Sequence, residues 1–195
     1  DMHLASEQHP ARAWEYSMAL LSAMVWEACG YHTGAAGPGR VALDVGGAGS
    51  PLEHMLRFRG WEVSVIDPSA QVFPMTIEEY VYNQGGSGGA DALFCVSVLE
   101  HVDDHWSTFE ACRRALKHGG LLFLTVDAWG EPATTPDTAH FHWMRRRIYC
   151  PESLLQLHQH LVTHGMESVG RVDPTWHGPA VYDYSFFSLA YVKVR

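Results

Sequence analysis

The sequence is poor in positive charge and in long apolar runs. Its 195 residues contain 13 lysines and arginines against 22 acidic residues, which gives a formal net charge of -9. A surface of this sign does not suit the phosphates of nucleic acids, so we expect no nucleic-acid partner. The apolar runs are shorter than the ~18 residues of a membrane span, and residues 1–10 lack the apolar core of a signal peptide. We therefore expect no membrane segment and a cytoplasmic location.

Closely spaced cysteines are also missing. Cys29, Cys95, Cys112 and Cys150 stand far apart, show no CxxC spacing and sit among apolar or helical residues. This distribution favours free thiols in a reducing compartment over disulfides or a zinc site. The remaining composition, 47% hydrophobic and 18% charged, is that of an ordinary globular chain, and the length fits a single domain over residues 1–195.

What the sequence does contain is a glycine-rich turn directly after a buried strand. Residues 41–45 are apolar apart from Asp44, which suits a parallel strand that is covered by helices on both faces. Gly46, Gly47 and Gly49 then remove side chains from the chain that follows. The backbone can therefore take positive φ there and come close to a ligand. This predicts a ligand-sized gap above the end of the strand.

The rest of the chain alternates strands with helices. The predicted strands cover residues 41–45, 61–66, 72–75, 91–99, 121–126, 166–172 and 184–194, and the predicted helices cover residues 11–29, 52–58, 76–82 and 151–164, with one more from Asp103 or Asp104 to Gly119-Gly120. The last two strands follow each other with only a loop between them. We therefore predict an α/β fold with a seven-stranded, mostly parallel sheet, helices on both faces and one antiparallel strand.

Two features of this pattern allow more than one interpretation. Trp14 and Tyr16, at the start of the first helix, belong either to the core or to a ligand lid, and their helical spacing favours the core. Asp67 follows the second strand, 18 residues after Gly49, where a carboxylate can accept hydrogen bonds from both ribose hydroxyls of a nucleoside. The alternative is a turn aspartate before Pro68. We favour the ribose role.

Four segments in register resemble the class I S-adenosylmethionine-dependent methyltransferases. They are Leu43–Gly46, Val65–Asp67, Val96–Val102 and Arg114–Leu122, and the resemblance extends over most of the chain. It implies a Rossmann-like sheet of seven strands, with the last inserted antiparallel between the fifth and sixth. It also implies S-adenosyl-L-methionine as the cofactor. The cofactor-binding residues carried over are Asp44, Gly46, Gly47, Ala48, Gly49, Asp67, Pro68, Ser97 and Leu99.

The chain departs from this family's pattern in two places. Ala48 and Ser50 stand where the first motif has its second and third glycines, and both replacements are small. The family often places an acidic residue after the third strand to bind the adenine amino group, and here only Thr76, Glu78 and Glu79 are available. A nicotinamide-dependent oxidoreductase is the less favoured alternative, because the turn lacks the third glycine that lets helix and strand pack closely. A noncatalytic binding or scaffold module of the same fold is the other.

Methyl transfer is an in-line displacement, so the protein mainly has to align the reactants in a dry pocket. We expect a small-molecule acceptor. His101, His140 and His142 are the candidate catalytic bases for an acceptor hydroxyl or amine. A metal site formed by His140, His142 and Asp127 is the less favoured alternative, and we expect no metal. Within the domain, residues 1–39 form an N-terminal helix and lid, 40–127 the cofactor-binding half and 128–195 the substrate-side half.

Overall fold

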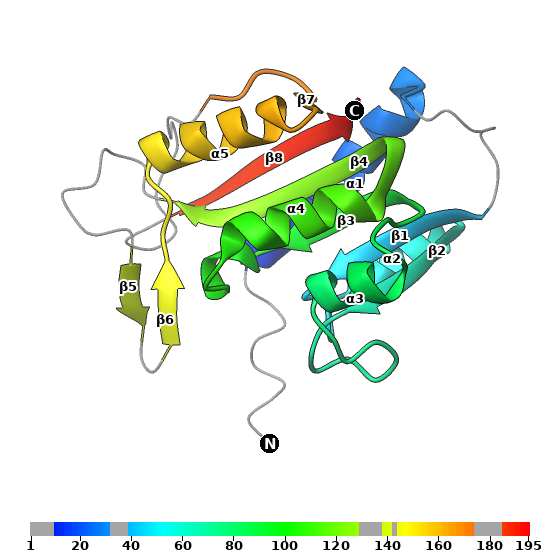
Figure 1. The fold of residues 1–195 in the computed structure, drawn as a ribbon, viewed down its shortest axis with the longest axis horizontal. Helices are drawn as coiled ribbons and strands as arrows, with labels where there is room; N and C mark the ends of the chain where they lie inside the picture. Colours follow the sequence, from blue (N-terminus) through cyan, green and yellow to red (C-terminus); the bar gives the residue numbers. More distant parts are fainter. Residues whose placement is uncertain (1–9, 32–38, 129–137, 142–143, 174–184) are drawn as a thin grey trace.

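The centre of the molecule is a six-stranded mixed sheet. The computed structural model describes residues 10–31, 39–128, 138–141, 144–173 and 185–195. In spatial order the sheet consists of β2 (Trp61–Ile66), β1 (Arg40–Val45), β3 (Ala90–Val96), β4 (Leu116–Ala128), β8 (Ser185–Lys193) and β7 (Met166–Ser168). The first four strands are parallel, and β8 runs antiparallel to both β4 and β7 (Figure 1). The predicted insertion of the last strand is therefore confirmed.

The predicted count of seven strands is wrong. The missing strand is the third, expected over residues 72–75, where only an isolated parallel bridge joins Phe73 to Ile66. Val72 is 76% exposed, so it gains no burial by joining the sheet. Pro74 has no backbone N–H to donate to a ladder. The sheet therefore ends at β2.

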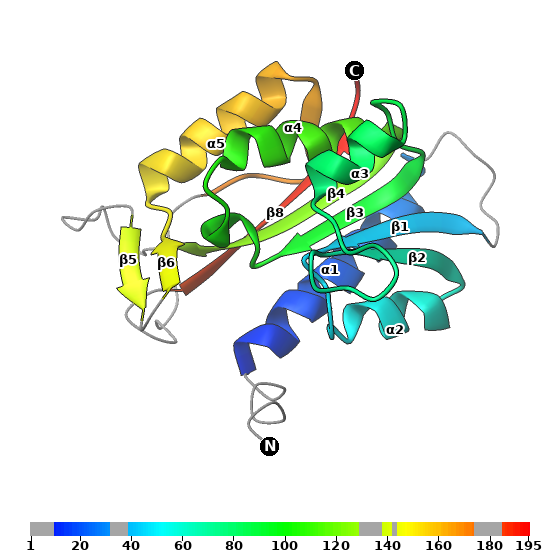
Figure 2. The ribbon, with the colours of Figure 1, turned by 60° about the horizontal axis from the view of Figure 1, so that its bottom comes forward.

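Helices cover both faces of the sheet, as predicted. α1 (Pro10–Cys29) and α2 (Leu52–Phe58) lie on one face, and α3 (Ile77–Asn83), α4 (His105–Ala115) and α5 (Pro151–Thr163) lie on the other (Figures 1 and 2). Two hydrophobic clusters fill the two layers, one centred on α1 and α2 and the other on α3, α4 and α5. The sheet is thus buried on both sides, and ligands reach it from the strand ends.

Local sequence sets most helix boundaries. Asp104 begins α4, because its carboxylate accepts hydrogen bonds from the backbone N–H groups of Trp106 and Ser107, both at 3.1 Å. The predicted end of this helix at Gly119-Gly120 is too late. α4 ends at Ala115, because Leu116 is buried and already pairs with Ala90 of β3.

An antiparallel hairpin was not predicted. It consists of β5 (Thr138–Phe141) and β6 (Met144–Arg147) and forms a sheet of its own. The hairpin stands at the carboxyl end of the main sheet, away from the helical layers (Figure 1), and β6 lies against the short 3-10 helix η1 (Leu99–His101) that follows β3. The segment between β4 and α5 is thus partly regular structure at the edge where ligands would enter.

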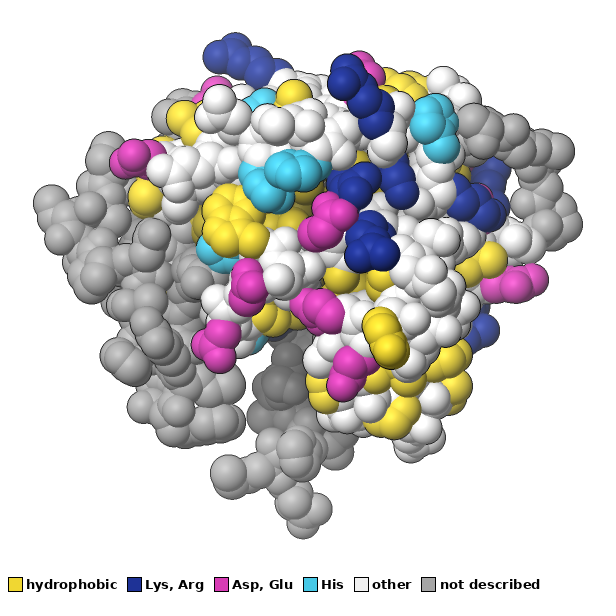
Figure 3. All heavy atoms as spheres, in the orientation of Figure 1, with side chains coloured by type: hydrophobic (Ala, Val, Ile, Leu, Met, Phe, Trp, Pro, Cys, Tyr) yellow, Lys and Arg dark blue, Asp and Glu magenta, His cyan; other side chains and the backbone are white. Residues whose placement is uncertain are grey.

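The described surface carries charges of both signs. On the face shown in Figure 3, acidic and basic side chains lie among one another and form no continuous basic surface in the described part of that face. Among the described residues, none of the helices has both the length and the apolar character to cross a membrane.

Candidate active site

A large cavity lies where the parallel strands end. Its volume is about 980 Å³, and its walls come from the glycine turn after β1, the end of β3 and the first turns of α1. Arg12 and Tyr16 line it from α1, and Val96 and Ser97 line it from β3. The carboxyl end of a parallel sheet is where α/β proteins bind their ligands, and this cavity occupies that position.

Two glycines of the turn allow close packing. Gly46 has φ of +71°, its N–H donates to the Ile66 carbonyl of β2 at 2.8 Å, and a β-carbon there would collide with the Val98 side chain. A β-carbon on Gly47 would collide with the carboxyl group of Asp44. Gly49 has open space around it, but its φ of +79° disfavours other residues. The predicted glycine positions therefore each meet a physical requirement.

Asp44 is a buried carboxyl group at the wall of this cavity. Its side chain is 1% exposed, and its Oδ2 has no hydrogen-bond partner among the described residues. Burial raises the pKa of Asp44 from 3.8 to about 7, and a hydrogen bond with Ser50 acts in the opposite direction. A buried acceptor without a partner is costly, so a donor or cation supplied by a ligand would stabilise it.

Asp67 connects the ends of β2 and β1. One carboxylate oxygen accepts from the Ala48 N–H at 3.2 Å, and the other accepts from the N–H and hydroxyl of Ser69, both at 2.7 Å. Burial acts to raise the pKa of Asp67, but the hydrogen bonds from Ser69 and Ala48 outweigh it, so the pKa is lowered. Asp67 therefore stays ionised beside the glycine turn, and Pro68 lies exposed in the adjoining turn. The Asp67 carboxylate also closes the turn that contains Pro68, which is the structural role that the alternative interpretation, a turn aspartate, assigns to it.

The other predicted cofactor contacts lie after β3. Ser97 is 5% exposed, lines the cavity and has φ of +51°, which is unusual for a residue other than glycine. Leu99 is fully buried in the core. The acids considered for adenine binding are both engaged: Glu79 closes the capping box of α3 with Thr76, and Glu78 accepts from the Thr108 hydroxyl at 2.6 Å.

Two of the three predicted bases lie in described elements. His101 is exposed at the end of η1, next to β6. His140 lies in β5, and its side chain, like the whole of His142, falls outside the described residues. The described part of the chain contains no cluster of three or more histidine, cysteine or acidic side chains that would hold a metal ion.

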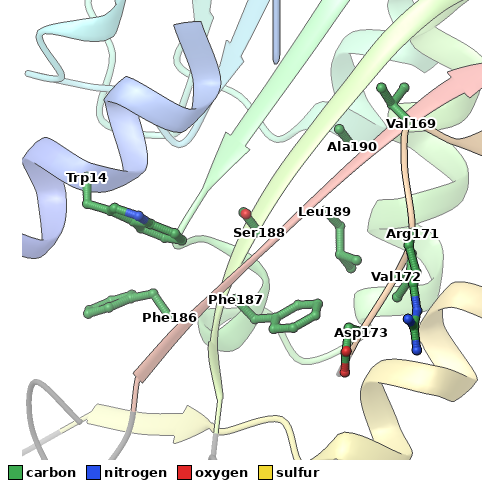
Figure 4. Close-up of a pocket in the computed structure, with 10 residues that line it drawn as sticks. All are labelled: Trp14, Val169, Arg171, Val172, Asp173, Phe186, Phe187, Ser188, Leu189 and Ala190. Atoms are coloured by element: carbon green, nitrogen blue, oxygen red, sulfur yellow. The ribbon is translucent and has the colours of Figure 1, made fainter. Parts of the chain in front are cut away.

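For the first helix, the sequence predicted core packing or a lid but not the buried position of Glu15. Tyr16 lines the large cavity, and Trp14 is 39% exposed, so the expected core packing of Trp14 is wrong. Trp14 instead lines a smaller pocket of about 250 Å³, together with Phe186 and Ser188 of β8 (Figure 4). Glu15, which stands between Trp14 and Tyr16 in the sequence, is 0% exposed. Its spacing from Ala19, Ala23 and Trp26, the buried positions of α1, was the signal that it points inward.

Comparisons with known proteins agree with this geometry. A family model described as a methyltransferase domain matches residues 29–168. Ubiquinone biosynthesis O-methyltransferase from Xanthomonas campestris pv. campestris (strain B100) is 31% identical over 106 residues, 46% of this chain and 44% of that protein, so the match spans less than half of the relative.

Two solved structures show the same fold. The 1,6-didemethyltoxoflavin-N1-methyltransferase of Burkholderia thailandensis, solved with S-adenosylhomocysteine, superposes with a TM-score of 0.64 at 14% identity, over 93% of this chain and 80% of that one. Geranyl diphosphate C-methyltransferase of Streptomyces coelicolor A3(2) has a TM-score of 0.56 at 17% identity, over 88% and 77% of the two chains. With the family model covering most of its length, the chain belongs to the methyltransferase domain family.

Proposed function

We propose that the chain is an S-adenosyl-L-methionine-dependent methyltransferase that transfers a methyl group in line to a small-molecule acceptor. The observation that carries the proposal is the close approach of Gly47 to the carboxyl group of Asp44. A buried carboxyl oxygen without a partner faces a cavity at the strand ends, and the glycine leaves room only because it has no side chain. Membership of the methyltransferase domain family supports the same conclusion.

The residues present fit this cofactor. S-adenosyl-L-methionine supplies an electrophilic methyl group on a sulfonium centre, and it also carries an ammonium group and a ribose. Asp44 would accept from the ammonium group, and Asp67 with Pro68 would face the ribose hydroxyls. Gly46–Gly49 would bring the backbone close to the ligand. Ser97 would line the end of the cavity, with the backbone of Leu99 below it. Two acidic groups suit a cationic ligand better than they would suit a pyrophosphate.

The chain's own contribution to the chemistry is alignment and proton removal. α1 covers the cavity with Arg12 and Tyr16, which reduces access of water to the reacting groups. His101, exposed beside the hairpin, would accept the proton of an acceptor hydroxyl or amine, and His140 of β5 and His142 are further candidates. No metal is needed in this scheme, since the methyl group carries its own activation.

The proposal for the methyl acceptor is less specific than the proposal for the cofactor. The named relatives methylate oxygen, nitrogen and carbon atoms, so the fold does not select the acceptor atom. We propose that residues 40–127 bind the cofactor, that residues 128–195 bind the acceptor and that residues 1–39 act as a lid. A cytoplasmic location and the absence of nucleic-acid or membrane partners complete the proposal, on the basis of the net charge of -9 and the lack of a long apolar run.

Thermal unfolding with added nucleotides tests the proposal. We expect S-adenosylhomocysteine at 1 mM to raise the melting temperature by several degrees, because a ligand that binds only the folded state stabilises it, and we expect NAD to have no effect. A shift with NAD alone would contradict the proposal. Methyl transfer from labelled S-adenosylmethionine to a pool of small metabolites then separates an enzyme from a noncatalytic binding module, which would bind the nucleotide and transfer nothing.

A further inference from the structure

Glu15 is a fully buried carboxylate in the first turns of α1. It occupies the inward face of the helix, in phase with Ala19, Ala23 and Trp26, which are all buried and uncharged. Acidic side chains are almost never fully buried without partners, because removing a charge from water is costly. Its partners therefore explain why a glutamate stands among apolar residues.

The carboxylate of Glu15 joins three elements. Oε1 accepts hydrogen bonds from the hydroxyl of Ser97, after β3, and from the hydroxyl of Thr125 in β4, each at 2.5 Å. Oε2 pairs with the guanidinium of Arg12, one turn earlier in α1, at 3.4 Å. Thr125 also accepts from the N–H of Ser97 at 3.0 Å, so Glu15, Ser97 and Thr125 form a closed network. Hydrogen bonds to an ionised carboxylate are among the stronger ones in proteins.

This network reaches the large cavity from two sides. On one side it holds Ser97 in a left-handed backbone conformation that residues other than glycine rarely adopt. The next residue, Val98, packs so closely against Gly46 that no β-carbon fits there. On the other side it holds the turn of α1 that contributes Arg12 and Tyr16 to the cavity wall. One buried carboxylate therefore fixes the α1 wall relative to the strand end and the glycine turn.

We propose that Glu15 is a positioning residue that sets the shape of the cofactor cavity by clamping α1 to Ser97 and Thr125. The inference rests on the proposed function, since it takes the cavity to be the site of S-adenosyl-L-methionine. Glu15 does not line the cavity itself. It acts through Arg12 and Tyr16 on one side and through the strained Ser97 on the other.

The test is the affinity of the full chain for S-adenosylhomocysteine, measured by titration calorimetry well below the melting temperature. Glu15→Gln keeps the shape of the side chain, replaces one acceptor oxygen by an NH2 donor and removes the charge that faces Arg12. We expect the dissociation constant to rise about tenfold, the effect of losing one or two hydrogen bonds to a charged group. Thr125→Val removes a hydroxyl of the same network at constant volume and should weaken binding in the same direction. In the double variant the two effects should be less than multiplicative.

Glu27→Gln is the matched control. Glu27 lies in the same helix and forms ion pairs with Arg40 and Arg59 at the opposite end of the sheet. We expect this variant to lower the melting temperature and to leave the dissociation constant within twofold of the wild type. Glu15→Gln with a lower melting temperature and unchanged affinity would overturn the inference and leave the proposed function intact. Absence of binding by the wild type would overturn both.

Discussion

The two ends of the central sheet differ in how their charged side chains are paired. At the amino end, the guanidinium of Arg40 lies over the rings of both Trp26 and Trp61, 5.8 and 5.6 Å from their centroids, and also pairs with Glu27. At the carboxyl end, Asp44 keeps a buried oxygen without a partner in the described structure. The charges named at the amino end are thus paired within the protein, whereas this oxygen of Asp44 lacks such a partner among the described residues.

One helix takes part in both arrangements. The last turns of α1 carry Trp26, whose Nε1–H donates to the Gly119 carbonyl at 2.7 Å, and Glu27. The first turns carry Glu15, which is bonded to the strand ends below the cavity. Internal pairing stabilises the fold, whereas we expect the unpartnered Asp44 oxygen and the left-handed backbone at Ser97 to favour ligand binding. Substitutions at the two ends should therefore change different quantities.

Gly47→Ala should produce the largest effect on binding. The new β-carbon would collide with the carboxyl group of Asp44, which would have to move. We expect affinity for S-adenosylhomocysteine to fall about 100-fold, as displacement by ~1 Å does in preorganised sites. Calorimetric titration measures it. Gly89→Ala is the control, because Gly89 has no positive φ and open space around it, and unchanged affinity of both variants would show that this turn does not bind the nucleotide.

Substitution of Asp67 and of Asp91 compares the two ends of the sheet directly. Asp67→Asn weakens the hydrogen bonds that the side chain accepts from Ala48 and Ser69. It should lower affinity for S-adenosylhomocysteine about tenfold, the effect of losing hydrogen bonds to a charged group. Asp91 is its counterpart at the amino end, where it accepts from the N–H of Val41 at 2.9 Å and from Lys117 at 2.8 Å. Asp91→Asn should lower the free energy of unfolding by about 1 kcal/mol and leave affinity unchanged. Equal effects on affinity would remove the distinction between the ends.

Asp44 should make both stability and binding depend on pH. Its pKa rises from the ordinary aspartate value of 3.8 to about 7 in the fold, so the folded state holds a proton that the unfolded chain releases between these values. The stabilising contribution is therefore complete below pH 3.8 and is lost as the pH rises to about 7. Urea unfolding of the wild type and Asp44→Asn from pH 4.5 to pH 8 measures the difference.

The same titration should act on the ligand in the opposite direction. Ionised Asp44 attracts the cationic S-adenosylmethionine better than the protonated group does, so affinity for it should rise about threefold to tenfold from pH 6 to pH 8. Asp44→Asn should remove this dependence. A variant that kept the wild-type pH profile would assign the dependence to another group.

Trp26→Phe should have the smallest effect on binding. It removes the hydrogen bond to Gly119 and part of the packing around Arg40. We expect a loss of about 1–3 kcal/mol in the free energy of unfolding and no change in nucleotide affinity beyond twofold. A large loss of affinity would mean that α1 transmits changes from one end of the sheet to the other.

Prediction from the sequence succeeded where the signal was local. The helix over residues 52–58 and the strand over residues 61–66 have the predicted boundaries. Side-chain periodicity marks both elements, and a glycine at residue 60 ends the helix before the strand begins. Prediction failed for the strand at residues 72–75, where Phe73 and Met75 pack against the core but only an isolated bridge joins Phe73 to Ile66. The β5–β6 hairpin was also missed, since no element was predicted between residues 127 and 150.

The sequence by itself determined the alternation of the main strands and helices, the glycine turn after Asp44 and the acidic end of β2, because periodicity, backbone freedom and capping act over a few residues. Only the tertiary structure decided what Glu15 does. Its partners Ser97 and Thr125 lie 82 and 110 residues away along the chain, and no local pattern encodes such contacts. Folding also buried Asp44, which raised its pKa to about 7 and made a strand residue part of the site.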